Sequence, residues 1–364
     1  MRWLPWGTGT LLLISLLVPA EAGWPGHRHA LDRVAARLCG QLIDHTHNHG
    51  ADRRIWSAAL CQRRDLYVYL PPGFDPSRRY PLGIYLHGAS QDEQSYLEGP
   101  ALAFDQAIAG GRLPPVIIAV PDGSLQGRQS LFRSASFFAN TLAGNFEDYL
   151  EQDVWDFLVR TYPIRPERQA HALIGASMGG SAAFAHAIKY RERYNLAIGF
   201  HPALNMRWVD CHGRYRGNFD PFCWGWRTEL RPNESLGRAK GFAIRFKYLL
   251  DPLIGRGPDA IARLSEFNPI EMLDRYDVRP GDVDLYIAYG GQDELNIDAQ
   301  VESFLYCARQ RGLKVDVAYD PHGRHDLQTG MRLFPAVIDW AAPRVAALDR
   351  LSPPTYARAL SPIK

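Results

Sequence analysis

This chain of 364 residues has little excess of either charge, few cysteines and few long apolar runs. Lys and Arg number 41 against 39 Asp and Glu, and this near balance gives no basis for binding nucleic acid or another polyanion. The five cysteines form no Cys-x-x-Cys pair, so a structural zinc site is not indicated. A hydrophobic fraction of 46% provides a substantial core and excludes wholesale disorder.

The longest apolar run lies near the N-terminus, at residues 11–18. It follows Arg2, and residues 20–22 read Ala-Glu-Ala, which together form the pattern of a cleavable secretory signal peptide. The run is short for a helix that spans a bilayer, although an uncleaved anchor is the alternative. We therefore expect residues 1–22 to be a signal peptide and the mature protein to be periplasmic or extracellular. Stable membrane insertion is not expected after cleavage.

Export would permit disulfides, which persist outside the cytosol. Cys211 and Cys223 close a short loop, and Cys39 and Cys61 are a second possible pair. Cys307 lies in a helical pattern and is expected to be a free thiol. The sequence alone does not determine which of these cysteines are bonded to each other.

Short apolar runs alternate with segments of helical periodicity along the chain. Strands that are apolar throughout and alternate with helices predict an α/β fold, with a mostly parallel central sheet covered by helices on both faces. The predicted strands are 41–45, 64–70, 80–86, 116–120, 171–174, 196–200, 283–289 and 314–319. The predicted helices are 30–38, 100–109, 146–162, 181–190, 299–311 and 327–340.

One connection is far longer than an α/β connection requires. About eighty residues separate Phe200 from Val283, so this segment must carry an insertion, which we place at about 205–270. Its aromatic residues and two cysteines are concentrated between Trp208 and Trp226. They would form either a substrate-binding lid or a small satellite core around a Cys211–Cys223 bridge. We expect one domain over 23–345, followed by a tail at 346–364.

A Gly-x-Ser-x-Gly pattern, Gly175–Gly179, stands between a predicted strand and a predicted helix. In such a tight turn the positions two before and two after the serine have no room for a side chain, and the serine hydroxyl is raised above the sheet edge. This context makes Ser177 the candidate nucleophile.

A serine nucleophile needs a base and an orienting carboxylate, in the chain order Ser, Asp or Glu, His. Asp293 follows a predicted core strand, and His325 lies between the last strand and the last helix. Both therefore belong to the sheet edge that carries Ser177. Glu294 and Asp298 are alternative acids, and His322 is the alternative base; Asp293 and His325 are preferred by position.

The oxyanion formed during acyl transfer needs hydrogen-bond donors. We expect one from the backbone N–H of Met178, directly after the nucleophile, and one from Ala89 in the loop after the strand that ends at Leu86. His87 is expected to brace this loop rather than to take part in the chemistry. His201, Trp224 and Trp226 are candidates for the substrate pocket.

Several stretches carry a more specific resemblance, which covers roughly residues 40 to 345. These are 67–74 (YVYLPPGF), 80–88 (YPLGIYLHG), 116–123 (VIIAVPDG), 144–149 (GNFEDY), 175–180 (GASMGG) and 323–326 (GRHD). In them the chain resembles the esterase D, or "putative esterase", family of α/β-hydrolases, whose members include S-formylglutathione hydrolases, feruloyl esterases and mycolyltransferases.

The resemblance implies an α/β-hydrolase fold. It gives Ser177, Asp293 and His325 the positions of a catalytic triad, and Ala89 and Met178 those of the oxyanion hole. Two features depart from the family. The chain has Gly-Arg-His where the family often has Gly-Gly-His, and the aromatic insertion is unfamiliar. Because of the unfamiliar insertion, the resemblance does not identify the substrate.

These observations predict an exported serine esterase that hydrolyses carboxylic esters and needs no metal or organic cofactor. The substrate would be a small-molecule, glycan or lipid ester. The alternatives are an acyltransferase to a sugar or lipid hydroxyl, an exported peptidase, and a catalytically silent glycan-binding protein of the same fold. The alternating His45, His47 and His49 have no matching carboxylate or cysteine and are interpreted as a polar strand edge rather than a zinc site.

Overall fold

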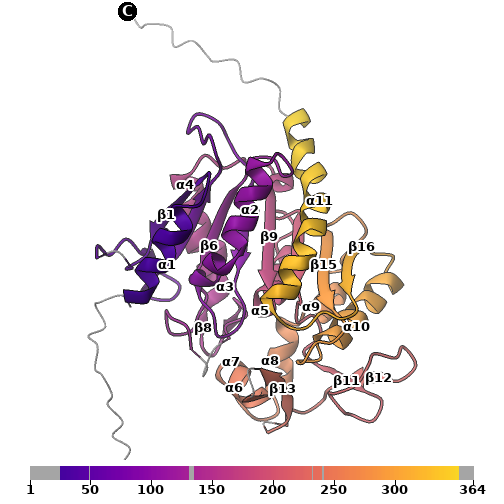
Figure 1. Ribbon diagram of the computed structural model, residues 1–364. Helices are drawn as coiled ribbons and strands as arrows, with labels where there is room; N and C mark the ends of the chain where they lie inside the picture. Colours follow the sequence, from indigo (N-terminus) through magenta and orange to yellow (C-terminus); the bar gives the residue numbers. More distant parts are fainter. Residues whose placement is uncertain (1–24, 49, 131–134, 232, 240–241, 352–364) are drawn as a thin grey trace, which may run out of the picture.

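The structure is a computed structural model that describes residues 25–48, 50–130, 135–231, 233–239 and 242–351 (Figure 1). The predicted signal peptide lies outside these residues. Their central feature is an eight-stranded sheet in the order β1-β4-β6-β5-β9-β10-β15-β16, which confirms the predicted α/β fold. Its strands are β1 (Gln41–His45), β4 (Leu66–Leu70), β5 (Leu82–Leu86), β6 (Ile117–Pro121), β9 (His171–Ala176), β10 (Leu196–Phe200), β15 (Asp284–Gly290) and β16 (Val315–Asp320).

The sheet is parallel from β6 to β16, and β4 pairs antiparallel with both of its neighbours. Strands β4, β5, β6 and β10 are buried along their whole length, as expected for strands covered on both faces. The carboxyl ends of the parallel strands meet at one edge, where ligands bind in open α/β sheets.

Helices cover both faces of the sheet, and two separate apolar clusters mark the two faces (Figure 1). One face carries α1 (Pro25–Ala35), α2 (Pro100–Ala109) and α11 (Leu327–Leu351). The other carries α4 (Trp155–Thr161), α5 (Met178–Lys189), α9 (Pro269–Arg275) and α10 (Ile297–Gln310). The predicted helix 146–162 is composed of α3 (Phe146–Asp148), a π-helical turn (Tyr149–Val154) and α4.

Two smaller points differ from the predicted boundaries. Helix α11 continues to Leu351, past the residue where a tail was expected to begin. The predicted strand 64–70 is divided between β3 (Gln62–Arg64), which pairs with β2 (Ile55–Ser57), and β4. None of the helices in the described ranges is long and apolar enough to cross a bilayer.

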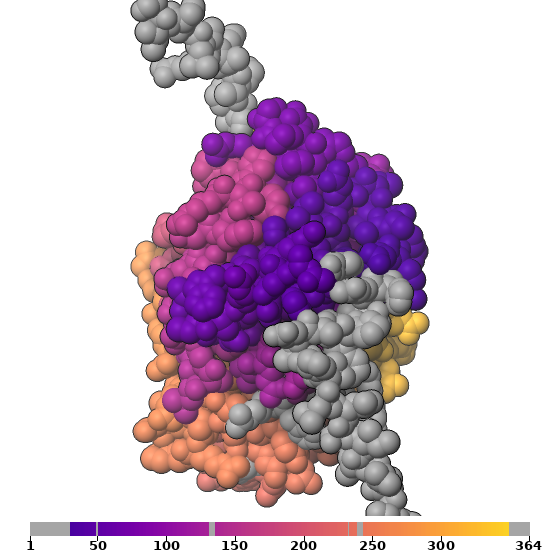
Figure 2. All heavy atoms as spheres, turned by 90° about the vertical axis from the view of Figure 1, so that its left-hand side faces the viewer, coloured from indigo at the N-terminus to yellow at the C-terminus, as the bar shows by residue number. Residues whose placement is uncertain are grey.

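The insertion begins after β10 and contains two short hairpins and three short helices. These are β11 (Trp208–Asp210), β12 (Trp224–Trp226), β13 (Ser235–Ala239), β14 (Phe242–Arg245), α6 (Phe246–Leu249), α7 (Asp251–Ile254) and α8 (Ala260–Glu266). It forms the lower end of the molecule in Figure 1, and the same orange segment lies below the indigo and magenta parts in Figure 2. Its buried side chains Trp208 and Tyr215 belong to the same apolar cluster as α5 and α10.

The insertion is attached to the rest of the chain at two distant places. At one, the N–H of Leu142, between β7 (Asn140–Thr141) and β8 (Gly144–Asn145), donates to Leu253 at 2.9 Å. At the other, the hydroxyl of Tyr215 donates to the carbonyl of Leu295 at 2.6 Å, just before α10. The insertion therefore reaches from the loops of one half of the sheet to those of the other.

Candidate active site

Ser177 occupies a tight turn between β9 and α5, with φ 54° and ψ −114°. Its N–H donates to Phe200 at 2.8 Å, which holds the turn against the end of β10. A Cβ at Gly175 would lie 2.2 Å from the carbonyl carbon of Gly179, and one at Gly179 would lie 2.0 Å from the oxygen of Leu86. The two glycines are thus required by the close approach of backbone to backbone.

The structure brings His325 to both Ser177 and Asp293. The hydroxyl of Ser177 lies 3.0 Å from Nε2 of His325, and Nδ1 of His325 lies 2.7 Å from Oδ2 of Asp293. These side chains come from three different loops at the carboxyl edge of the sheet, after β9, β15 and β16. The arrangement is a continuous hydrogen-bonded chain from hydroxyl to imidazole to carboxylate.

The charges of Asp293 and His325 support each other. Burial would raise the pKa of Asp293, but the imidazole of His325 outweighs it and holds that pKa below its usual value. Burial likewise opposes protonation of His325, yet the charge of Asp293 and its hydrogen bond raise the pKa of the imidazole above 6.5. Asp293 also accepts the N–H of Leu295 at 2.8 Å. The carboxylate is therefore ionised and fixed beneath the imidazole.

The alternative residues take other positions. Glu294 accepts the backbone N–H of His325 at 3.0 Å and pairs with Arg324, so it holds the histidine's loop but not its ring. Burial and the charge of Asp293 raise the pKa of Asp298 to about 6. His322 is exposed, with its ring 3.5 Å from the amide nitrogen of Gln292. Arg324, which departs from the family pattern, thus pairs with the residue next to the acid.

The loop after β5 lies beside the nucleophile. A Cβ at Gly88 would lie 3.6 Å from that of Ser177. His87 is fully buried; its Nδ1 donates to the carbonyl of Gly88 at 2.8 Å, and its Nε2 accepts the N–H of Gly123 at 2.9 Å. Burial lowers its pKa, so the ring is neutral. His87 therefore braces this loop, as expected from the sequence.

The two predicted oxyanion donors are backbone N–H groups at the start of α5 and in the loop after β5. Met178 is the first residue of α5, where a helix leaves its N–H groups without partners of its own. Ala89 follows Gly88, whose own N–H is held by the side chain of Gln91 at 2.9 Å. Neither the N–H of Ala89 nor that of Met178 donates to another residue in the part of the chain that the structure describes. Both donors are thus available to a substrate oxygen.

His201 lies beside His325. It follows β10 with a positive φ of 45°, and its ring centroid is 5.4 Å from that of His325. Only 5% of the residue is exposed, and neither ring nitrogen has a hydrogen-bond partner among the described residues. Burial, together with the charge of His325, lowers the pKa of His201 to about 4, so this second imidazole is neutral.

The two tryptophans named as pocket candidates have ring contacts within the insertion and with α10. Trp224 has ring contacts with Phe219, with Trp226 and with Tyr306 of α10, at centroid distances of 5.8, 5.3 and 6.4 Å. Arg207 lies over the ring of Trp226 at 5.6 Å. Among the described residues neither tryptophan has a ring contact with a histidine. Trp224 thus packs against α10 and the apolar cluster to which α10 belongs, and its place in a substrate pocket stays a prediction.

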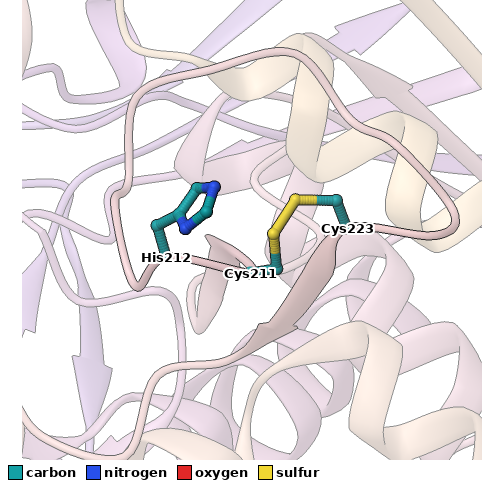
Figure 3. Close-up of side chains that lie close together, drawn as sticks. All are labelled: Cys211, His212 and Cys223. Atoms are coloured by element: carbon teal, nitrogen blue, oxygen red, sulfur yellow. A yellow bond between two sulfur atoms is a disulfide. The ribbon is translucent and has the colours of Figure 1, made fainter.

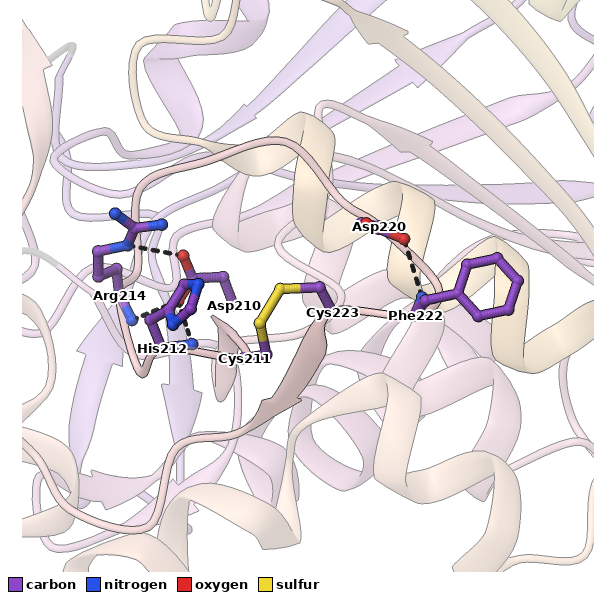
Figure 4. Close-up of a disulfide and its surroundings, with 7 residues drawn as sticks. All are labelled: Asp210, Cys211, His212, Arg214, Asp220, Phe222 and Cys223. Carbon is purple, nitrogen blue, oxygen red and sulfur yellow. Dashed lines mark hydrogen bonds and ion pairs between the residues drawn. A yellow bond between two sulfur atoms is a disulfide. The ribbon is translucent and has the colours of Figure 1, made fainter.

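A disulfide bridges the β11–β12 hairpin. Cys211 and Cys223 are bonded, with a Cα–Cα distance of 4.6 Å (Figure 3). The turn is further held by Asp210, which accepts the N–H groups of His212 and Arg214 at 2.9 and 2.8 Å (Figure 4). Phe222, at the tip, is 97% exposed. The other cysteines, Cys39, Cys61 and Cys307, are free, so the possible pair Cys39–Cys61 is not formed.

Sequence reasoning missed the groups that fix the acid loop from the side of the insertion. Arg216 donates to the carbonyl of Glu294 at 2.6 Å. A Cβ at Gly237 of β13 would lie 1.9 Å from that same oxygen, so the second hairpin packs directly on the loop. No motif or spacing relates these residues to Asp293, because they meet only in the folded chain.

A family model described as "Putative esterase" matches residues 57–342, which is most of the chain. The protein belongs to this esterase family. It is therefore a carboxylic-ester hydrolase with the α/β-hydrolase fold, and the resemblance to the "putative esterase" family is confirmed.

Several solved structures have a fold similar to that of the esterase. A ferulic acid esterase is 16% identical, with a TM-score of 0.60 over 85% of this chain and 99% of that one. An S-formylglutathione hydrolase from Agrobacterium tumefaciens is 14% identical, with a TM-score of 0.59 over 85% and 96%. A fluorophosphonate-binding serine hydrolase from Staphylococcus aureus is 16% identical, with a TM-score of 0.58 over 84% and 98%. These likenesses show a shared fold.

One curated relative also matches over a shorter stretch. It is endo-1,4-beta-xylanase Y from Acetivibrio thermocellus, 28% identical over 130 residues, which cover 32% of this esterase. The match spans only 11% of the length of that much longer protein.

Proposed function

We propose that the protein is an exported serine esterase that works through a Ser177–His325–Asp293 triad and a covalent acyl-enzyme. The observation that carries this proposal is the hydrogen-bonded chain from hydroxyl to imidazole to carboxylate, with distances of 3.0 and 2.7 Å. A serine hydroxyl is a weak nucleophile until such a base removes its proton. The same three groups have no evident use in a protein that only binds glycans.

The reaction begins when Oγ of Ser177 attacks the ester carbonyl and Nε2 of His325 takes its proton. The carbonyl oxygen becomes an oxyanion, which the N–H groups of Ala89 and Met178 stabilise. Asp293 keeps the proton-bearing Nδ1 of His325 turned toward itself and stabilises the imidazolium. His325 then protonates the leaving alkoxide, and an acyl group remains on Ser177.

Water completes the cycle. His325 removes a proton from a water molecule, which attacks the acyl-enzyme. The bond from the acyl carbon to Oγ of Ser177 breaks, His325 returns the proton to Oγ, and the carboxylic acid is released. A sugar or lipid hydroxyl at the same position would instead accept the acyl group, so an acyltransferase uses the same residues. Product analysis with and without added sugar or lipid alcohols separates these two outcomes.

A fluorophosphonate probe tests the nucleophile. The wild-type protein should be labelled at Ser177, and Ser177→Ala should not be labelled at all. Ser181 lies one turn further along α5 and is fully buried, so Ser181→Ala is a matched control that should keep its label. Labelling that persists in Ser177→Ala would contradict the proposal.

The acyl group can be identified with a panel of p-nitrophenyl and feruloyl esters. Feruloyl esters are included because one solved neighbour is a ferulic acid esterase. If the insertion forms a wall of the pocket, Trp226→Ala should raise KM for bulky aromatic esters and leave acetate esters unaffected. Phe222→Ala, at the exposed tip of the same hairpin, is the control. Equal KM values for all variants would assign the hairpin a purely structural role.

Export rests on the N-terminal pattern and on the Cys211–Cys223 bridge, since disulfides form and persist in oxidising compartments. Mass spectrometry of the protein from its native host should find a mature chain that begins after Ala22. A full-length chain confined to the cytosol would contradict this part of the proposal.

A further inference from the structure

Three groups of potential metal ligands occur among the described residues, and two of them are already engaged. In the first, the sulfurs of Cys211 and Cys223 are bonded to each other beside His212 and do not serve as ligands (Figure 3). The second is a set of buried carboxylates, Asp65, Glu93 and Asp122, in which Arg64 pairs with Asp122 at 2.9 Å. The third consists of His201, Asp293 and His325.

The third group differs because it contains an imidazole without a partner. His201 is 5% exposed, and neither of its ring nitrogens has a hydrogen-bond partner among the described residues. Buried polar groups in folded proteins are almost always hydrogen-bonded, and an unpaired one costs stability. Its backbone has a positive φ of 45° and is held by a hydrogen bond from its N–H to Ala288 at 2.8 Å. The fold thus maintains His201 in a costly position facing the triad.

We propose that His201, His325 and Asp293 together chelate a transition metal ion such as Zn²⁺, and that the bound ion reversibly inhibits the esterase. One ligand atom from each residue lies within 4.8 Å of the other two. Two nitrogens bound to one tetrahedral Zn²⁺ are about 3.4 Å apart, from Zn–N bonds of about 2.0–2.1 Å. Small side-chain rotations therefore suffice to bring the three ligands around one ion.

The ion should inhibit because two of its ligands, His325 and Asp293, are the proposed base and its orienting acid. This expectation of inhibition rests on the proposed function. Nε2 of His325 faces Ser177, and Nδ1 faces Asp293. An ion on Nε2 removes the lone pair that would accept the serine proton. An ion on Nδ1 replaces the hydrogen bond that orients the ring and leaves the ring's single proton on Nε2, which then cannot accept the serine proton. In either case the base is lost while the ion is bound, and the ion is an inhibitor rather than a cofactor.

The ligand set also selects the metal. Two imidazoles and one carboxylate suit Zn²⁺ and Cu²⁺, whereas Mg²⁺ and Ca²⁺ prefer oxygen ligands. Zn²⁺ and Cu²⁺ should therefore bind and inhibit, and Mg²⁺ at the same concentration should do neither.

Direct binding is tested first, by titrating Zn²⁺ calorimetrically into protein that carries Cys39→Ser and Cys61→Ser. These two free cysteines are exposed and would otherwise bind zinc themselves. In this background one Zn²⁺ should bind per chain, and His201→Asn should weaken that binding by at least about 100-fold, since even outer partners of metal ligands change affinity by about 10–100-fold. Asn is chosen because it tolerates a positive φ. His201→Gln is the second variant should the first fail to fold.

Activity is tested next, with p-nitrophenyl acetate and each variant compared with its own metal-free rate. Zn²⁺ should inhibit the parent protein, a chelator should restore the rate, and His201→Asn should lose most of this sensitivity. His322→Gln, which removes the exposed histidine near His325, is the matched control and should remain sensitive. The proposal is overturned if Zn²⁺ does not bind the parent protein, or binds it as tightly after His201 is replaced.

The two readouts separate this inference from the proposed function. If the protein hydrolyses no ester but binds Zn²⁺ through His201, the esterase mechanism fails and the metal site stands. If hydrolysis is normal and Zn²⁺ sensitivity follows His322 instead of His201, the metal site fails and the mechanism stands.

Discussion

The Ser177 turn and the disulfide-bridged hairpin lie at the same end of the molecule but are built in different ways. At the turn, Cβ atoms at Gly175 or Gly179 would collide with backbone at 2.2 and 2.0 Å, so the residue types are dictated by steric contact. In the β11–β12 hairpin a Cβ at Gly225 meets no atom within 4 Å, and Phe222 is almost fully exposed. The first region tolerates one arrangement, whereas the second is held together by a covalent bond, by the hydrogen bonds of Asp210 and by a few aromatic contacts.

The largest effect should come from the turn. Ser177→Ala should lower kcat by about 10⁶-fold, as removal of a triad nucleophile does in other serine hydrolases. The fold should be unaffected, because among the described residues the hydroxyl makes one hydrogen bond, to His325. Steady-state kinetics with p-nitrophenyl acetate, together with circular dichroism, provide the measurement. A variant that retains more than a trace of turnover would show that the turn is not the reacting centre.

The next effect distinguishes two neighbouring carboxylates. Asp293→Asn should reduce kcat by about 10⁴-fold, because the amide cannot hold the imidazole in the required tautomer. Glu294→Gln should cost far less, since Glu294 contacts the backbone N–H of His325 and not its ring. The comparison is made by kcat for both variants under identical conditions. The opposite ranking would move the acid to Glu294.

The hairpin should respond through stability rather than through catalysis. The two cysteines of the bridge are separated by 12 positions. In the chain-entropy model a disulfide that closes a loop of this length stabilises the folded protein by about 3 kcal/mol. Replacing Cys211 and Cys223 together by Ser should therefore expose residues 211–223 to limited proteolysis while turnover of acetate esters is retained. Loss of activity in the intact double variant would show that the hairpin shapes the site itself.

A smaller effect, which depends on pH, is expected from the buried contacts of helix α5. In α5, His186 contacts Glu151 and the carbonyl of Phe138 at 2.7 and 2.8 Å. Burial opposes its charge, but Glu151 outweighs burial and raises the pKa of His186 above 6.5. A raised pKa in the folded state stabilises the protein fully below the unfolded value, and this contribution is lost as the pH rises through the folded pKa.

The matching variant is His186→Gln. It should lower the free energy of unfolding by roughly 2 kcal/mol at pH 6, the magnitude of hydrogen bonds to charged groups, and by less at pH 9. Denaturant unfolding at both pH values measures the difference. A loss that stays constant with pH would mean that the imidazole carries no charge in the folded protein.

Much of the fold and of the site follows from local sequence. Apolar runs such as Leu196–Phe200 predict buried parallel strands because only strands covered on both faces are apolar throughout. The glycines around Ser177 predict the turn because no other residue fits there. Asp293 and His325 could be placed at the same edge because carboxyl ends of parallel strands meet there.

The contacts that complete the site could not be predicted in this way. Arg216 donates to the carbonyl of Glu294 and Gly237 packs closely against it, yet the sequence spacing of neither residue relates it to the acid. The ring contacts of Trp224 with Phe219, Trp226 and Tyr306 likewise join residues whose sequence spacing indicates no contact, and its place in a substrate pocket stays a prediction. Aromatic composition predicts that a segment is packed, not which surface it packs against.

The sequence by itself therefore predicted the α/β class, the order of the candidate residues Ser177, Asp293 and His325 along the chain, and the tight turn at Ser177, because these depend on local periodicity and on backbone sterics. The tertiary structure alone decided that Asp293 rather than Glu294 reaches the imidazole, that Cys39 and Cys61 remain unpaired, and that His201 lies buried beside His325. Such pairings join residues from separate loops, and their distances are set by how the whole sheet and its insertion pack.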